Sequence, residues 1–351
     1  MPNGQAQQQV TPFRLNTQKR INANSADNFQ AHAVGSVVNY QFDKEGALAG
    51  IWFLLRGTVT LSNTGALANR APWNIVKRFR LTLNNNAVTC VDVDGYHAYQ
   101  LGKIMVQGYG ADGAGVYTPH ILSYSAPVSS GANTWVIPYF IPLSLNQGSD
   151  VLTGAINMQA RTANLTLEVT MEPTMSNVVS NFSSLSLTGE VYNVWYELRD
   201  NTENPPLLLV TCQQKTDPIV ATGETDHEII PQGDLVQLVN EVILNGTRNS
   251  ADVIAYKYKQ ASSKFPSIIP PQLMGNMYSM MYSKAIDSGI FVSDFFYAMD
   301  GPNQGDNMNI IHTDNFTRQD IIVDIAGTAT LGSGNNFFHT TERRIILLTA
   351  N

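Results

Sequence analysis

The sequence predicts an all-β protein made of two tandem β-sandwiches. Three observations support this: the length of the chain, its strand rhythm and an internal similarity between its halves. A chain of 351 residues suits two domains of about 150 residues better than one. Short apolar and polar runs, separated by Gly, Asn and Pro, fill both halves and are typical of strands and turns. Strands therefore dominate each expected domain.

Two series of apolar segments predict the strands. In the first half the expected strands are residues 37–42, 51–61, 75–83, 135–145 and 164–171. In the second half they are residues 189–198, 207–212, 290–298, 320–325 and 343–348. Short strands spaced in this way, with turn residues between them, are the pattern of β-sandwiches.

Composition changes along the chain predict the domain boundaries. The first 34 residues are polar and Gln-rich, and carry Arg14, Lys19 and Arg20 before the first acid, Asp27. We interpret them as a basic arm, partly helical because Thr11-Pro12 is a helix-start signal. The expected order is an arm (1–34), a first sandwich (35–174), a Ser/Asn-rich linker (175–184) and a second sandwich (185–351).

A helical period appears in a few places. Leu235, Leu238, Val239, Val242 and Ile243 would share one face of a helix, with Asp234 as its cap and Gly246 at its end. Residues 96–105 form a weaker helical candidate, and residues 278–282 indicate another short turn. We expect these to be short helices inserted between strands.

Segments of the first half recur in the second. Gly35–Asn39 resembles Gly189–Asn193 at an offset of 154, and Asn146-Gln147-Gly148 recurs as Asn303-Gln304-Gly305 at an offset of 157. A similar strand follows each triplet, at 165–169 and at 321–325. Two matches in the same order favour a duplicated β-domain.

The charge content limits the class of function. Charged residues make up 14% of the chain, against roughly 25% in an average domain. A neutral polar surface suits burial against other copies, and it also suits a loop-rich β protein. The net charge of -7 argues against a general nucleic-acid surface, so we expect no sequence-specific nucleic-acid binding. Cys90 and Cys212 are expected to be buried free thiols.

The sequence contains no convincing motif for catalysis or for binding a cofactor or metal. Gly108–Gly113 matches a dinucleotide fingerprint, but the breaker-rich residues 114–119 that follow cannot start the required helix. The acidic stretches 92–95 and 300–306 lack the register of a calcium loop and are interpreted as turns. The histidines show no zinc spacing, and no secretory signal or membrane span is evident. We expect no enzyme activity, metal or cofactor, and synthesis in a cytoplasm.

Three patches carry a resemblance to the major coat proteins of tectiviruses. The first is Trp135-Val-Ile-Pro-Tyr-Phe-Ile-Pro-Leu143 followed by Ser149-Asp-Val-Leu-Thr-Gly-Ala155. The second is Gly95-Tyr96-His97, and the third is the stretch Ile229–Asn240. They occur in the family's order and, with the Gln-rich arm, cover about a fifth of the chain. The second half is shorter than in that family and ends in an extra segment, 328–348.

This resemblance implies a double jelly-roll, that is, two eight-stranded jelly-roll sandwiches with short inserted helices and an N-terminal arm. It implies a major capsid protein that forms homotrimers of pseudo-hexagonal outline in a virion, assembled in the host cytoplasm over an internal membrane. Expected partners are neighbouring trimers, minor capsid or vertex proteins, and membrane lipids. Arg14, Lys19 and Arg20 of the arm are expected to contact neighbouring subunits or lipid headgroups.

Two alternatives remain at the level of sequence. One is a phage spike or another glycan-binding protein with two β-sandwiches, which would use tryptophans as stacking platforms: Trp52, Trp73, Trp135 or Trp195. The other is a β-sandwich hydrolase whose carboxylate pair is assembled only by the fold. Saturable sugar binding or turnover would distinguish them from a chain that associates with itself.

Overall fold

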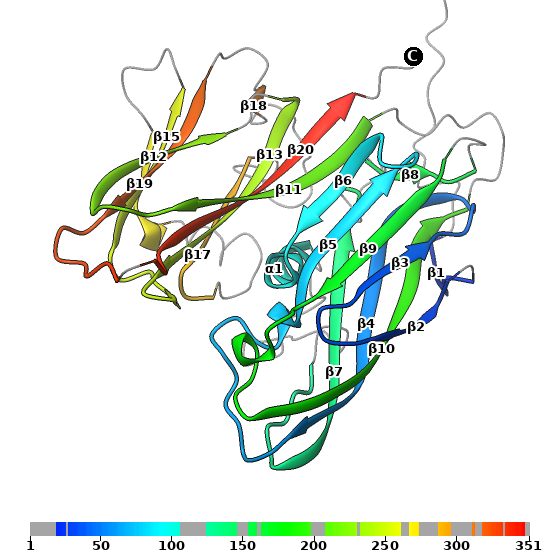
Figure 1. Cartoon of the computed structure of the whole chain (residues 1–351). Coiled ribbons are helices and arrows are strands. Elements are labelled where there is room, and N and C mark those ends of the chain that lie inside the picture. Colours follow the sequence, from blue (N-terminus) through cyan, green and yellow to red (C-terminus); the bar gives the residue numbers. More distant parts are fainter. Residues whose placement is uncertain are drawn as a thin grey trace, which may run out of the picture.

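The computed structural model describes residues 19–25, 27–105, 124–145, 154–159, 163–197, 208–229, 232–260, 267–273, 287–295, 311–312, 318–332 and 334–347. These residues form two β-sandwiches that lie side by side (Figure 1). We call residues 19–197 barrel 1 and residues 208–347 barrel 2. The predicted fold class, two tandem jelly-roll sandwiches, is confirmed.

Barrel 1 contains the following elements: β1 (Lys19–Ala23), β2 (Phe29–His32), β3 (Val37–Gln41), β4 (Ala47–Leu61), η2 (Trp73–Ile75), β5 (Val76–Leu83), β6 (Val88–Val93), α1 (Gly95–Met105), β7 (Gly131–Pro142), β8 (Ile156–Asn157), β9 (Leu165–Met171), η4 (Met175–Asn177) and β10 (Phe182–Tyr196). One sheet has the order β1-β10-β4-β7, with β2 also on β10, and the facing sheet has the order β3-β9-β5-β6.

Barrel 2 contains β11 (Leu208–Pro218), β12 (Gly223–Ile229), β13 (Asp234–Leu244), β14 (Thr247–Arg248), β15 (Val253–Gln260), β16 (Ser267–Ile269), β17 (Ile290–Asp294), β18 (Ile311–His312), β19 (Gln319–Ile325) and β20 (Phe337–Leu347). Its two sheets follow the orders β11-β20-β13-β17 and β12-β19-β15-β16.

The two barrels have the same connectivity. In chain order, β1/β2, β3, β4, β5, β6, β7, β9 and β10 of barrel 1 correspond to β11, β12, β13, β15, β16, β17, β19 and β20 of barrel 2. The similarity between 165–169 and 321–325 fits this scheme, because these segments lie in β9 and β19. The match of Gly35–Asn39 with Gly189–Asn193 does not, because both segments lie in barrel 1. The two Asn-Gln-Gly triplets lie outside the described residues.

The observed boundary between the barrels differs from the expected one. β10 pairs with β4 from Phe182 to Tyr196, so residues 185–196 belong to barrel 1 and not to the second domain. The expected arm also ends earlier, because β1 and β2 pair with β10. These strands contain few apolar residues, and main-chain hydrogen bonds to β10 hold them in place. Sequence hydropathy does not report such bonds.

The predicted helix at 235–243 is wrong, because these residues lie in β13. Every residue of β13 after Asp234 is buried, and the strand pairs with β20 on one side and with β17 on the other. A strand buried on both faces has apolar residues at every spacing, including the helical one. The weaker candidate at 96–105 is confirmed as α1. The turn at 278–282 and the helix start at Thr11 lie outside the described residues.

The remaining predicted strands are present, and the longest core strands extend beyond their expected ends. The sequence patterns missed three longer strands, β6, β12 and β15, and four short ones, β8, β14, β16 and β18. β12 (Gly-Glu-Thr-Asp-His-Glu-Ile) is a polar edge strand, and its acidic residues conceal the alternation. In the part of the chain that the structure describes, no helix has both the length and the apolar character needed to cross a membrane.

Candidate functional site

The contact between the two barrels contains the most unusual chemistry in the described chain. β11 of barrel 2 runs parallel to β6 of barrel 1, with Cys212 opposite Val91 and Gln213 opposite Asp92. This pairing joins one sheet of each barrel into a single ten-stranded sheet. α1, which connects β6 to β7, lies between the barrels (Figure 1). We call this contact the junction.

Apolar packing is continuous through the junction. Leu209, Cys212, Val239, Ile290 and Val292 belong to barrel 2, yet they are buried in the same hydrophobic cluster as the core of barrel 1. Barrel 2 has its own separate core around Leu238, Val242 and Phe338. The outer face of the β11-β20-β13-β17 sheet is therefore buried by barrel 1, while its inner face lines barrel 2.

A group of charged and imidazole side chains crosses this apolar contact. We call Arg70, Asp94, His97, Glu241 and His339 the junction cluster. Arg70 Nη2 lies 2.6 Å from Asp94 Oδ2 and 3.1 Å from Glu241 Oε2, and thus connects the two barrels. His97 Nε2 is 3.2 Å from the same Glu241 oxygen. The side chains of His97 and Glu241 are fully buried.

Asp94 organises the barrel 1 side of the cluster. It precedes α1 and caps it, since its Oδ1 accepts a hydrogen bond of 2.8 Å from the backbone N–H of His97. Its Oδ2 accepts a second bond, of 2.9 Å, from Nε2 of Gln214 in β11. One carboxylate therefore fixes the start of the helix, the arginine and the first strand of barrel 2.

Burial and charge shift the ionisation of the junction cluster. Burial alone would raise the pKa of Asp94, but Arg70, and then His97 and His339, hold it well below its usual range. Burial likewise opposes the charge on Glu241, and Arg70 together with the hydrogen bond from His97 lowers its pKa. Burial, and then the charge of Arg70, lower the pKa of His339 to about 4. At neutral pH the cluster is held as two carboxylates around one guanidinium, with His339 neutral.

A second set of polar contacts fixes the other side of α1. Asp287, just before β17, accepts hydrogen bonds of 2.6 Å from Gln100 and 2.7 Å from Lys103. Arg248 bonds the hydroxyl of Tyr96, and its guanidinium lies 4.9 Å from the centre of the Tyr96 ring. Because contacts of α1 with barrel 2 occur along most of its length, the helix determines how the barrels are oriented.

Among the arginines and lysine of the expected arm, the structure describes the side chain of Arg20 alone. Arg20 lies in β1, where Nη2 is 3.1 Å from Glu197 Oε2 and the guanidinium lies 5.9 Å from the Trp195 ring. It is thus engaged with its own chain. Arg14 lies outside the described residues, and of Lys19 only the backbone is described.

Two of the four tryptophans proposed as sugar platforms lie in the core. Trp135 is fully buried and Trp73 is 4% exposed, so neither can stack on a ligand. Trp52 packs on Phe140 with a centroid distance of 4.5 Å. Cys90 and Cys212 are buried free cysteines, as predicted, and burial raises the pKa of each thiol to about 12.

Both aspartates of the acidic stretch 92–95 take part in ion pairs. Asp92 receives two hydrogen bonds from Arg78, and Asp94 belongs to the junction cluster. Across the described ranges, no group of three or more His, Cys, Asp or Glu side chains is placed to hold a metal ion. The glycine-rich stretch 108–113 and the acidic stretch 300–306 lie outside the described residues.

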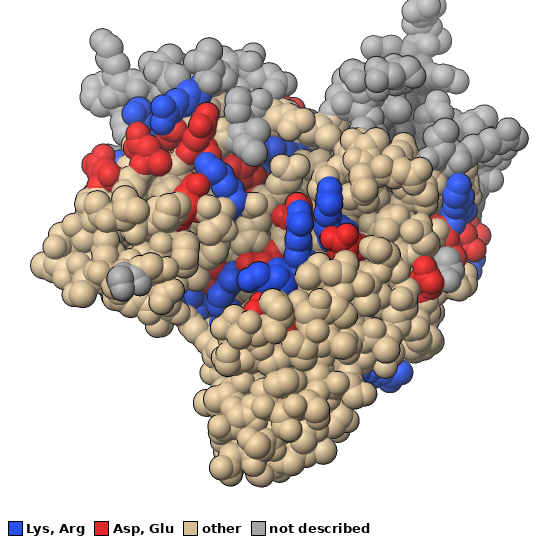
Figure 2. Space-filling view, viewed as in Figure 1, with Lys and Arg blue, Asp and Glu red and all other residues tan. Residues whose placement is uncertain are grey.

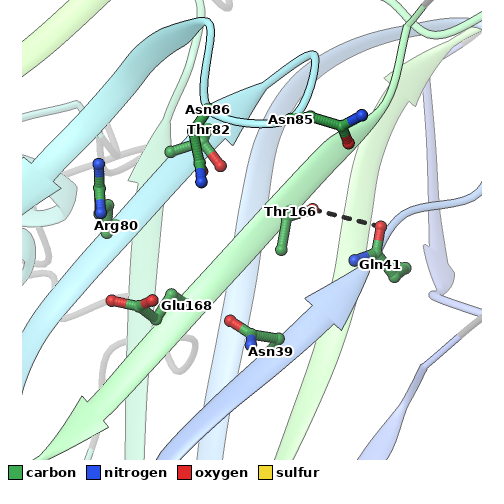
Figure 3. A pocket seen from close by; sticks show the side chains of 8 residues that line it. All are labelled: Asn39, Gln41, Arg80, Thr82, Asn85, Asn86, Thr166 and Glu168. Carbon is green, nitrogen blue, oxygen red and sulfur yellow. Dashed lines mark hydrogen bonds between the residues drawn. The ribbon is translucent and has the colours of Figure 1, made fainter.

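A shallow polar depression lies on the outer face of the β3-β9-β5 sheet of barrel 1 (Figure 3). It has a volume of about 260 Å³ and is lined by amides, hydroxyls and one residue of each charge: Asn39, Gln41, Arg80, Thr82, Asn85, Asn86, Thr166 and Glu168. No aromatic ring lines it, so it lacks the stacking surface of a typical sugar site.

Charge is distributed unevenly over the molecule. Figure 2 shows charged side chains near the line between the barrels and at the upper end of the view, while the lower end of barrel 1 is uncharged. The sequence agrees, because residues 57–69, 124–142 and 173–189 contain no Asp, Glu, Lys or Arg. Some of these sparse charges join the two barrels, as in the pairs of Glu241 with Arg70 and of Asp287 with Lys103.

Two jelly-roll sandwiches of equivalent connectivity, joined side by side in one chain, define the double jelly-roll fold. The sequence matches no model of a protein family, and no curated protein matches it. The structure is similar to that of the major capsid protein of Sulfolobus turreted icosahedral virus, with a TM-score of 0.70 and 13% identity. That match covers 94% of this chain and 97% of the other.

Two further solved structures show the same fold. The major capsid protein of bacteriophage PM2 matches with a TM-score of 0.56 and 9% identity, over 95% of this chain and 99% of that one. A chain of the PBCV-1 virus capsid matches with a TM-score of 0.63 and 9% identity, over 96% and 97% of the two chains. At such low identity the shared feature is the fold, and it extends over nearly the whole chain.

Sequence patterns did not identify the junction cluster. A signal was nevertheless present, because Glu241 interrupts a strongly apolar run in a chain with few charges. A charge at the centre of an apolar strand requires a buried partner. Arg70 and Asp94 could not have been assigned as its partners, since they are distant in sequence and meet only through the junction.

Proposed function

We propose that this chain is a major capsid protein whose homotrimers, pseudo-hexagonal in outline, build an icosahedral shell. The role is structural and not catalytic. One observation carries the proposal: two equivalent barrels meet through unlike surfaces, the first strand of barrel 2 against the fifth strand of barrel 1. The solved structures with this fold are capsid components, which supports the same role here.

The physical argument concerns closure. A contact between unlike surfaces repeats until a ring closes or a filament grows. Inside one chain the contact is made once, which leaves the corresponding first strand of barrel 1 (β1/β2) and fifth strand of barrel 2 (β16) at sheet edges. Three chains with two barrels each would close a ring of six similar units. Such a ring has the outline needed to tile a shell with its neighbours.

Light scattering combined with negative-stain imaging of the purified full chain tests this proposal. We expect a particle of three times 38.5 kDa with a near-hexagonal outline, and lattices or shells at high concentration. A chain that stays monomeric at every concentration would contradict the capsid role. Without the trimer, the proposed contacts with neighbouring trimers and with minor or vertex proteins could not form either.

We further propose that residues 1–18, with Arg14, and the adjacent Lys19 contact neighbouring subunits or an internal membrane. Each Lys or Arg near an anionic membrane contributes about 1 kcal/mol, so this contact would assist assembly without anchoring the chain. The same role is proposed for Arg20, whose side chain is 45% exposed beside Glu197.

Two truncations separate the arm from the fold. Deletion of residues 2–18 is expected to leave the thermal midpoint and the trimer unchanged and to reduce shell formation, as measured by light scattering. Deletion of residues 2–30 removes β1 and half of β2 and exposes the edge of β10, so it is expected to destabilise barrel 1. Normal shells from the shorter truncation would contradict a role of the arm in assembly.

A further inference from the structure

The polar depression on barrel 1 is a regular grid of side chains on the outer face of the β3-β9-β5 sheet (Figure 3). It contains two cross-strand rows with one residue from each strand: Asn39, Glu168 and Arg80 in the first row, and Gln41, Thr166 and Thr82 in the second. The outward side chains of a strand recur at every second residue, about 7 Å apart. An extended peptide has the same repeat, so a peptide that lies along the strands would meet both rows in register.

The first row contains polar groups without partners. Arg80 and Glu168 occupy opposed positions, yet neither side chain makes an ion pair or a hydrogen bond among the described residues, and Nε of Arg80 is buried without an acceptor. The carboxamide of Asn39 has no partner there either. In the second row, the hydroxyl of Thr166 donates a hydrogen bond of 3.2 Å to Oε1 of Gln41. A buried donor without an acceptor is costly, so a ligand that supplies oxygen atoms to this row is favoured.

The corresponding sheet face of barrel 2, on β12-β19-β15, is built differently. There Lys257 pairs with Glu224, and its Nζ also lies 3.9 Å from Oδ2 of Asp324. Nζ of Lys259 lies 3.9 Å from Oδ2 of Asp226. The charges on this face thus have partners within the same sheet. Unpaired polar groups are therefore a feature of the barrel 1 face and not of this sheet in general.

The chemistry of the depression fits an extended, amide-rich peptide with a positive charge. A carboxamide has the same donor and acceptor as a peptide group, so Asn39 and Gln41 can each bond the main chain or the amide side chains of such a segment. Arg80 can donate to carbonyl and carboxamide oxygens, and Glu168 can accept from a basic side chain. Since no aromatic ring lines the depression, binding would depend on these hydrogen bonds.

Residues 2–18 of this chain have the matching composition. They include seven Asn or Gln residues, one basic residue, Arg14, and no acid. They precede β1, which lies at the same end of barrel 1 as the depression, because Asn24 at the end of β1 donates a hydrogen bond of 2.6 Å to the carbonyl of Gln41. A segment of this length reaches up to roughly 60 Å when extended. It is therefore long enough to leave its own barrel and reach another copy.

The depression stays accessible when the proposed trimer forms. The junction uses β6, α1 and β11, and closure of the ring uses β1/β2 and β16. The outer face of the β3-β9-β5 sheet belongs to none of these contacts, and Asn39 and Gln41 are exposed. This face is thus free to receive a segment from another trimer.

We propose that the polar depression binds residues 2–18 of a chain in a neighbouring trimer as an extended peptide. Arg14 pairs with Glu168, while peptide or carboxamide groups bond Asn39, Gln41 and Arg80. The inference rests on the shell proposed above and names the site that receives the N-terminal segment.

Peptide binding tests the site directly. A labelled synthetic peptide of residues 2–18 is titrated into full-length trimers below the concentration at which shells form, and fluorescence anisotropy is measured. Saturable binding is expected, weakened about fivefold by Glu168→Gln or by Arg14→Gln in the peptide, the effect of losing one partly exposed ion pair. Because both changes remove the same pair, combining them should weaken binding little further. Glu228→Gln is the matched control, since Glu228 is an exposed strand residue on the outer face of barrel 2.

Exchange of the two charges tests whether the contact joins different chains. Full-length Arg14→Glu and Glu168→Arg are each expected to reduce shell formation, measured by light scattering, because like charges then meet in every contact. An equal mixture of purified trimers of the two variants should recover shells in part, since half of the possible contacts between them join opposite charges. Thermal midpoints near that of the wild-type chain would show that both variants fold.

The outcomes separate this inference from the capsid role. A wild-type chain that forms neither trimers nor shells overturns both. Wild-type shells together with a peptide that does not bind, or that binds Glu168→Gln as tightly as the wild type, overturn the site and leave the capsid role standing. Shells that recover in the chain carrying both exchanges, but not in the mixture, would show that the segment binds its own chain and overturn the contact between trimers.

Discussion

Replacement of Arg70 by Met is expected to lower the free energy of unfolding by about 3–5 kcal/mol, the cost of leaving buried charges without their partner. Met keeps much of the apolar volume but removes the guanidinium that lies 2.6 Å from Asp94 and 3.1 Å from Glu241. Two carboxylates would then face each other at the junction without the guanidinium that lies between them. Urea unfolding followed by tryptophan fluorescence measures the loss.

Arg78→Met is the matched control for this prediction. Arg78 also makes a two-bonded pair with a carboxylate, Asp92, but its side chain is 44% exposed. Exposed pairs contribute about 1 kcal/mol or less, so a small change is expected. Adding Asp94→Asn and Glu241→Gln to Arg70→Met should recover part of the stability. Equal losses in Arg70→Met and Arg78→Met would show that the junction cluster is not a buried charge network.

The general architecture could be predicted because the alternation of apolar and polar residues along a strand is a local property of the sequence. Strands with one buried face, such as β9, alternate clearly and were identified nearly to the residue. β13 was mistaken for a helix because burial on both faces erases the alternation. β1 and β2 were mistaken for part of an arm because they are held by main-chain bonds to β10, which sequence patterns do not encode.

The junction was harder to predict than the barrels. The duplicated connectivity implies that two similar units exist, and the similarity of β9 and β19 indicated it correctly. How the units meet depends on the pairing of β6 with β11 and on α1, whose residues are far apart in the sequence. Glu241 and Arg70 are 171 positions apart, the difference between their residue numbers. Only the folded chain brings such charges together.

The stability of the chain is expected to fall steeply on acidification from pH 6.5 towards pH 4. His339 at the junction and His32 in barrel 1 are buried, and burial lowers the pKa of each to about 4 from a usual value of 6.5. In this window the unfolded chain binds protons that the folded chain excludes, so the free energy of unfolding decreases as the pH falls. Each histidine contributes up to about 1.4 kcal/mol per pH unit. Below this window the lowered pKa values of Asp94 and Glu241 extend the loss, because the unfolded carboxylates protonate first.

Urea unfolding at pH 7.5, 6.0 and 5.0 measures this slope, and two histidine variants assign it. His339→Gln removes the imidazole while its amide can still bond Thr216, whose hydroxyl lies 2.7 Å from Nδ1 of His339. His32→Gln removes the other buried imidazole, which lies in the core of barrel 1 and away from the junction. Each variant should flatten the slope by up to about 1.4 kcal/mol per pH unit, and the double variant by about twice as much. If the double variant keeps the wild-type slope, the acid sensitivity arises elsewhere. If only His339→Gln flattens it, the junction is the acid-labile part of the chain.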